Sequence, residues 1–159
     1  MRRLPWDRIL SLFAFALAMG YLEAVVVVYI RHLAGLAGTS PHLDYRALLP
    51  TLPPWLIRTE ISREAATLAM LVGVALAAGR TWRERLCVFL LTFGVWDIVY
   101  YAGLKILLDW PASLRATDLL FLIPHPWFAP VWLPVVISLG MIVVSLALYP
   151  PARAHRRRG

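Results

Sequence analysis

Long apolar runs alternate with polar connections along this chain. Four of the runs have the length and composition of membrane-spanning helices, over residues 9–30, 56–78, 86–108 and 131–149. A helix rises about 1.5 Å per residue, so roughly 20 apolar residues cross the hydrocarbon core of a bilayer. Prolines and glycines stand mostly between the runs, where they end helices. The pattern predicts an all-α fold, an integral membrane four-helix bundle that forms a single domain over residues 1–159.

The connections between the runs differ in length. Residues 79–85 form a short basic turn, whereas residues 33–55 and 109–130 form longer loops. Within the second loop, the stretch from Asp118 to Ile123 is largely apolar and predicts a short helix before the last span, either interfacial or re-entrant. The prolines that follow this stretch would end such a helix, because proline cannot continue one.

A cleaved signal peptide is the rival interpretation of the first run, since Ala16-Leu17-Ala18 has the small residues of a cleavage site. The apolar run continues for twelve residues beyond Ala18. That continuation is too long for the apolar region of a signal peptide, which covers about 7–15 residues in all. We therefore expect the first run to be an uncleaved helix.

Composition supports the membrane assignment. Sixty per cent of the residues are hydrophobic and the mean hydropathy is +0.69. A soluble domain of this size cannot bury so much apolar surface, so lipid must cover part of it. The single cysteine, Cys87, excludes an intrachain disulfide. It begins an apolar run, and we expect it to be a small buried side chain.

The net charge of +7 is a topology signal, because its distribution is uneven. Ten of the sixteen basic residues lie in three segments, near residues 2–8, 80–85 and 153–158, which hold only two acids. Basic residues accumulate on the cytoplasmic side of membrane proteins. We therefore expect a multi-pass protein of the bacterial cytoplasmic membrane, with both termini in the cytoplasm. Its partners would be membrane lipids, other membrane subunits or a second copy, and not nucleic acid.

Ionisable side chains within the apolar runs are costly, so each needs a reason to be there. They gather at a similar depth, toward the outer ends of three predicted helices. The first run carries one, the second carries four and the third carries two: Glu23; Arg58, Glu60, Arg63 and Glu64; Asp97 and Lys105. The carboxylates of Glu23, Glu64 and Asp97, with few bases near them, predict a polar pocket that opens outward.

Helical spacing places these groups on common faces. Residues three and four apart lie on one side of a helix. Glu60, Arg63, Glu64 and Thr67 therefore share one face of the second helix. Asp97, Tyr100 and Tyr101 share one face of the third. Arg63 can neutralise a glutamate of its own helix. We expect Lys105 to reach back toward Tyr101 and Asp97, and Glu23 to find its partner on another helix.

These positions suggest a ligand site. Burial raises the pKa of a carboxyl group toward useful values, which makes Glu64 and Asp97 the candidate acid–base residues, although whether the protein is an enzyme is left open. The candidate ligand-binding residues are Glu23, Glu60, Arg63, Tyr100, Tyr101 and Lys105. The ligand would be an amphiphile or a small polar molecule from the outer leaflet. Two alternatives stay open: a structural or assembly subunit whose ion pairs fix helix register, and a weaker one, proton or ion translocation.

No cofactor is predicted. The four histidines lie outside the middles of the helices, which argues against a bis-histidine haem, and no Glu-x-x-His pair suggests a di-iron site. A hard metal held by Glu23, Glu64 and Asp97, or one also bound by His125, remains open without a ligand-spacing motif to support it.

Two further patterns have membrane interpretations. An interfacial belt would account for the tryptophans near the outer boundary, which are Trp55, Trp110, Trp127 and Trp132. In the second run, small residues recur at four-residue spacing and would allow close helix–helix packing: Ala65, Ala69, Gly73 and Ala77.

Several stretches resemble an uncharacterised group of small bacterial membrane proteins with four helices. The most distinctive is Phe93-Gly94-Val95-Trp96-Asp97-Ile98-Val99-Tyr100-Tyr101, and the others are residues 21–29, 63–68 and 120–124. The resemblance covers most of the chain and implies the same bundle. It brings no known activity with it.

Overall fold

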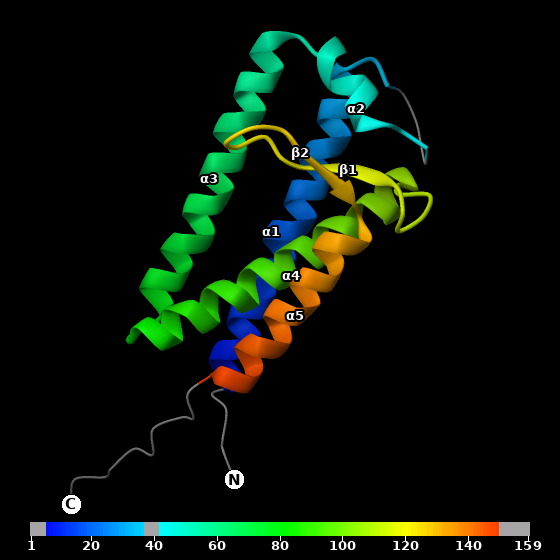
Figure 1. The fold of residues 1–159 in the computed structure, drawn as a ribbon. Coiled ribbons are helices and arrows are strands. Elements are labelled where there is room, and N and C mark those ends of the chain that lie inside the picture. The colour runs from blue at the N-terminus through cyan, green and yellow to red at the C-terminus, as the bar shows by residue number, and fades with distance from the viewer. Residues whose placement is uncertain (1–5, 37–41, 150–159) are drawn as a thin grey trace, which may run out of the picture.

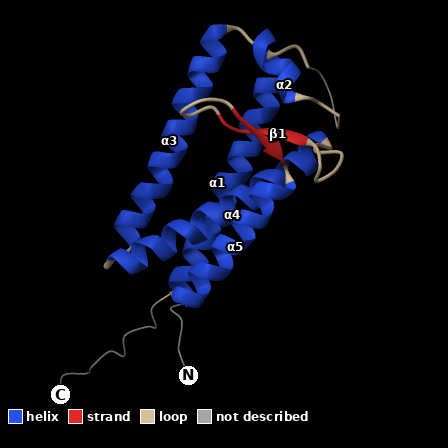
Figure 2. Ribbon diagram, viewed as in Figure 1, coloured by secondary structure: helices blue, strands red, loops and turns tan. Residues whose placement is uncertain are grey.

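The computed structural model describes residues 6–36 and 42–149 and is mostly helical (Figures 1 and 2). Four long helices correspond to the four predicted runs: α1 (Trp6–Leu33), α3 (Pro54–Ala78), α4 (Trp82–Leu108) and α5 (Trp132–Leu148). The first long loop contains two short helices, α2 (Tyr45–Leu48) and the 3₁₀ turn η1 (Leu49–Thr51), and the second contains strands β1 (Thr117–Phe121) and β2 (Trp127–Pro130). The predominantly helical class is confirmed, with a small sheet added.

Three of these helices, α1, α3 and α4, are long and apolar enough to cross a membrane, and α5 is a shorter apolar helix of 17 residues. At about 1.5 Å per residue, α5 rises roughly 25 Å. The structure is therefore compatible with a multi-pass membrane protein.

Helix α4 is the centre of the bundle, since α1, α5 and α3 all pack against it (Figure 1). Two glycines allow the closest approaches. A Cβ atom on Gly20 of α1 would lie 2.5 Å from the carbonyl oxygen of Trp96, and one on Gly94 of α4 would lie 2.6 Å from that of Ser138 on α5. Larger side chains at either position would force the helices apart, so α1 and α5 are held firmly on α4.

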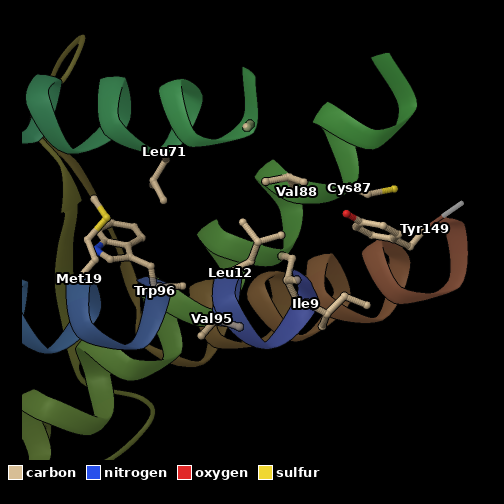
Figure 3. Close-up of a cluster of buried hydrophobic side chains, with 12 residues drawn as sticks. Ile9, Leu12, Met19, Leu71, Cys87, Val88, Val95, Trp96 and Tyr149 are labelled. Atoms are coloured by element: carbon tan, nitrogen blue, oxygen red, sulfur yellow. The ribbon is translucent and has the colours of Figure 1, made fainter. Parts of the chain in front are cut away.

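Buried apolar side chains from α1, α3 and α4, together with Tyr149 just after α5, form the main core (Figure 3). Leu71 of α3 points toward Met19 and Trp96 there, and Cys87 is fully buried in the same cluster, near Tyr149, as expected. The core lies toward the end of the bundle where α1 begins and α5 ends. The carbonyl oxygen of Leu148 accepts a hydrogen bond of 3.1 Å from Arg83, so these ends and the α3–α4 turn lie together.

This gathering of helix ends fits the charge pattern. The described basic residues of the predicted cytoplasmic segments, Arg8, Arg80, Arg83 and Arg85, belong to this end, where Arg8 lies 3.7 Å from Glu84. The remaining residues of those segments lie in 1–5 and 150–159, outside the described residues.

The prediction of a short helix over Asp118–Ile123 is wrong. Strands β1 and β2 form an antiparallel hairpin in which Asp118 pairs with Ala129 and Leu119 with Phe128. The backbone groups that a helix would have satisfied internally are satisfied by the second strand instead. In the turn, two N–H groups donate to Glu64 of α3. Those partners are distant in sequence, so the local apolar pattern could not reveal the strand.

The small-residue row of α3 does not pack against another helix of this chain. Its four members, Ala65, Ala69, Gly73 and Ala77, are exposed. The buried face of α3 instead carries Leu56, Glu64, Thr67, Leu71 and Ala75. Close helix–helix packing through this row therefore stays a prediction, which would involve a helix from outside the described residues.

Candidate functional site

A pocket of about 420 Å³ lies among the first half of α3, α1, α4 and α5, with the hairpin and the α2–η1 segment contributing to its wall. Its size falls within the usual range of ligand pockets, about 300–1,000 Å³. Seven of the eight predicted site residues line it, namely Glu23, Glu60, Arg63, Glu64, Asp97, Tyr100 and Tyr101. The polar helix faces predicted from three- and four-residue spacing therefore line the same pocket.

Lys105 is the exception. Its ammonium group lies 2.6 Å from the Asp109 carboxylate and donates to the carbonyl oxygens of Asp109 and Pro111 at 3.3 and 3.2 Å. Asp109 ends α4 in the left-handed conformation, with φ of 51°. Lys105 therefore caps the carboxyl end of α4, where a cation suits the helix dipole, and the expected contact with Asp97 is wrong.

Glu23 finds its partner on another helix, as predicted. Arg63 forms an ion pair with Glu23 of α1, and its Nε donates a hydrogen bond of 2.9 Å to Glu60 one turn away on α3. The Thr67 hydroxyl also lies 3.4 Å from the Glu23 carboxylate. One guanidinium thus serves two carboxylates and ties α3 to α1.

Glu64 joins α3 to the hairpin. One carboxylate oxygen accepts a 2.8 Å hydrogen bond from the backbone N–H of Leu122, and the other accepts one of 3.2 Å from Ile123. Glu64 is buried, and both of its oxygens are engaged in holding the turn of the hairpin at the pocket. The first role that the geometry gives this residue is therefore a mechanical one.

Asp97 has a different setting. Its Oδ2 accepts a 2.8 Å hydrogen bond from the Ser138 hydroxyl of α5, and both side chains are buried. Among the described residues, no basic group lies within ion-pair distance of Asp97. Asp97 is thus a buried carboxyl group with one neutral partner, facing the same pocket as the Arg63 cluster.

Sequence reasoning missed Asp118, which also lines the pocket. The Tyr101 hydroxyl donates to it at 2.7 Å and the N–H of Leu119 at 2.8 Å. Burial raises the pKa of Asp118 to about 7, although both hydrogen bonds oppose the shift. The sequence does carry a sign of this role, because Asp118 is an acid within an apolar stretch. The predicted helix over this stretch gave Asp118 no partner.

Arg31, in the last turn of α1, is a second missed residue. Its Nη2 and Nε donate to the Tyr45 hydroxyl at 2.8 and 3.3 Å. The signal was available, since Glu23, Val27 and Arg31 recur at four-residue spacing and share one face of α1. The partner Tyr45 comes from α2, which the hydrophobic pattern did not predict.

Trp110 departs from the predicted interfacial belt. It is fully buried, its ring stacks on that of Tyr101 at 6.4 Å, and it meets Tyr45 edge-on at 5.3 Å. Trp55, Trp127 and Trp132 are about half exposed, which suits a belt. Trp110 instead braces the pocket wall.

Among residues 6–36 and 42–149, no three His, Cys, Asp or Glu side chains come close enough together to hold a metal ion. Glu23, Glu64 and Asp97 each bind a different protein donor instead. Comparison with known proteins adds no assignment, because no protein-family model matches the chain and no curated protein or solved structure is significantly similar to it.

Proposed function

We propose that this protein is a four-helix protein of the bacterial cytoplasmic membrane whose pocket binds an amphiphile from the outer leaflet. The observation that carries the proposal is the lining of the pocket. On α4, Phe89 and Phe93 line it before Asp97 and Tyr100 do, so its apolar part lies deeper in the bundle and its polar part nearer the hairpin. An amphiphile fits this arrangement with its apolar chain in the deeper part and its polar headgroup near the hairpin.

The outer surface supports the membrane part of the proposal. Large apolar side chains are exposed on each long helix, for example Leu22 on α1, Met70 on α3, Ile106 on α4 and Val143 on α5. Water would make such a surface an aggregation hazard, whereas lipid covers it at no cost. The basic end of the bundle is the cytoplasmic one under the positive-inside rule, which turns the pocket and the hairpin outward.

Asp97 is the residue best suited to exchange a proton with a bound ligand. A general acid or base must reach the reacting group and must have an accessible proton site. Glu64 has both oxygens engaged by backbone N–H groups, while Asp97 has one hydrogen bond, from a serine. The polar residues that would bind the headgroup are Glu23, Glu60, Arg63, Tyr100 and Tyr101.

A cavity-filling substitution tests the proposal. Met141 of α5 lines the pocket, and Val143 on the same helix is 66% exposed. After mild purification, native mass spectrometry should find an amphiphile bound to the unchanged protein and to Val143→Trp. Met141→Trp should lose most of it, because an indole would occupy the chain-binding part. Equal retention by Met141→Trp, or no bound amphiphile in the unchanged protein, would contradict the proposal.

One observation favours the assembly-subunit alternative. The small-residue row of α3 is exposed, and a Cβ atom added at Gly73 would meet no other atom within 4 Å. Such a face allows another transmembrane helix to approach closely. Loss of a larger complex in Gly73→Leu, seen by native electrophoresis, would support this second role.

Proton or ion translocation is less well supported. The core that contains Leu12, Leu71 and Val88 lies on the basic side of the pocket. These side chains are buried and apolar, and they offer a moving ion no ligands. A path through one chain would have to open this core.

A further inference from the structure

A buried guanidinium in the pocket forms no ion pair with a described residue. Arg31 is 2% exposed, and among the described residues its Nη1 has no hydrogen-bond partner. Within the described part of the chain, no carboxylate lies within 4 Å of it. Burying a charge without a paired partner is strongly unfavourable, so an arginine in this position requires a reason beyond packing.

The guanidinium is held in place by neutral groups. Two of its nitrogens donate to the Tyr45 hydroxyl, and its central carbon lies 5.5 Å from the ring centres of both Tyr45 and Trp110. Those two rings contact each other edge-on. Aromatic faces attract a guanidinium but do not neutralise it. Arg31 is thus fixed in orientation with one donor edge unused.

The carboxylates that face the pocket are engaged elsewhere. Glu23 and Glu60 bind Arg63, and Glu64 binds the hairpin backbone. Asp118 accepts from Tyr101 and Leu119 and forms no ion pair with Arg31. The charge of Arg31 acts to lower the pKa of Asp118, but burial outweighs it and brings that pKa to about 7, so Asp118 is partly protonated near neutral pH. The positive charge of Arg31 therefore remains available to a ligand.

The Tyr45 hydroxyl adds a second donor at the same place. Its oxygen accepts from Arg31, which leaves its own hydrogen to donate. Burial raises the pKa of Tyr45 to about 12, so this hydrogen is retained at physiological pH. A guanidinium edge beside a hydroxyl donor matches the oxygens of a phosphate or carboxylate group.

We infer that Arg31 and Tyr45 form an oxyanion subsite, and that the amphiphile of the proposed function carries an anionic phosphate or carboxylate headgroup. The apolar chain of the ligand rests on the proposed function. The negative charge of its headgroup rests on Arg31 alone. The headgroup lies against Arg31 and Tyr45, beside the carboxyl-terminal end of α1, and the chain extends toward Phe93.

Binding to the full chain in dodecyl maltoside micelles tests the inference. The probes are dodecyl phosphate, dodecanoate, dodecanol, dodecyltrimethylammonium and inorganic phosphate. We expect dodecyl phosphate or dodecanoate to bind at least about tenfold more tightly than dodecanol. That ratio corresponds to about 1.4 kcal/mol, near the low end for a hydrogen bond to a charged group. Arg31→Met should abolish the preference, and Arg31→Lys should keep part of it.

Arg46→Met is the matched control. Arg46 is exposed on α2, its guanidinium lies 5.3 Å from the Phe128 ring centre, and it does not line the pocket. The anion preference should survive this change. Without ligand, Arg31→Met should melt at or above the temperature of the unchanged protein, because it removes an unpaired buried charge. A clearly lower melting temperature would assign Arg31 a structural role and overturn the inference.

The remaining outcomes separate the two proposals. Equal binding of all the dodecyl probes overturns the oxyanion subsite and leaves amphiphile binding intact. Binding of inorganic phosphate alone, lost in Arg31→Met, supports the subsite and refutes the amphiphile. Binding of no probe, together with no effect of Met141→Trp on bound lipid, overturns both.

Discussion

Replacing Glu64 by glutamine should release the hairpin from α3. The carboxylate receives two backbone hydrogen bonds, of 2.8 and 3.2 Å, from the turn between β1 and β2. Each bond to a charged group contributes about 1.5–3 kcal/mol, and a neutral replacement about 1 kcal/mol. Glutamine has one oxygen, and it turns N–H donors toward the second backbone donor. The docked state of the hairpin should lose about 2–5 kcal/mol.

Amide hydrogen exchange measures this loss at the two donors. Because each 1.4 kcal/mol is a factor of ten, protection of the Leu122 and Ile123 amides should fall at least about 30-fold. Glu60→Gln is the control, since Glu60 lies one turn away and binds Arg63. Amides of α4 should exchange as before in both variants. Unchanged protection in Glu64→Gln would refute the idea that this carboxylate holds the hairpin, and an equal loss in Glu60→Gln would show a less specific effect.

Three further predictions concern thermal stability. Asp97→Asn and Lys105→Met should have additive effects on the free energy of unfolding, to within about 0.5 kcal/mol, because the two groups do not touch. A coupling energy above about 1 kcal/mol in the double variant would contradict this. Asp118 has a raised pKa in the folded protein, so as pH rises the unfolded chain releases this proton first. Stability should therefore fall between about pH 4 and pH 7, and Asp118→Asn should flatten that part of a plot of melting temperature against pH. Gly94→Ala should cost about 1–3 kcal/mol, since its Cβ would meet a carbonyl oxygen at 2.6 Å, whereas Gly73→Ala should be neutral or stabilising in the same thermal assay.

The helices and most of the pocket could be predicted because their signals are local. A run of apolar residues sets each long helix, and spacing of three and four residues placed Glu60, Arg63 and Glu64 on one face. The ion pair between Glu23 and a base of another helix also followed from local reasoning, because a buried acid needs a partner.

What could not be predicted depends on contacts between distant segments. Asp118 lies in a strand because a second strand and Glu64 satisfy the backbone around it. Lys105 has a nearer acceptor in the carboxyl end of its own helix than in Asp97. Arg31 lies just beyond the predicted first span, and its contacts come from Tyr45 of α2 and from Trp110. In each case the side chain is positioned by a contact that the periodicity of apolar residues does not reveal.

The walls of the pocket differ in how they are supported. On one side, α1 and α5 meet α4 backbone to backbone at glycines, which leaves no slack around Asp97. On the other side, α3 joins the apolar core through Leu71 and Ala75 in its second half, and its first half is held by polar contacts. The side of the pocket formed by α1, α4 and α5 is therefore rigid, while the first half of α3 can move more easily. Space in this pocket can therefore be gained by displacing α3, while the geometry around Asp97 stays fixed.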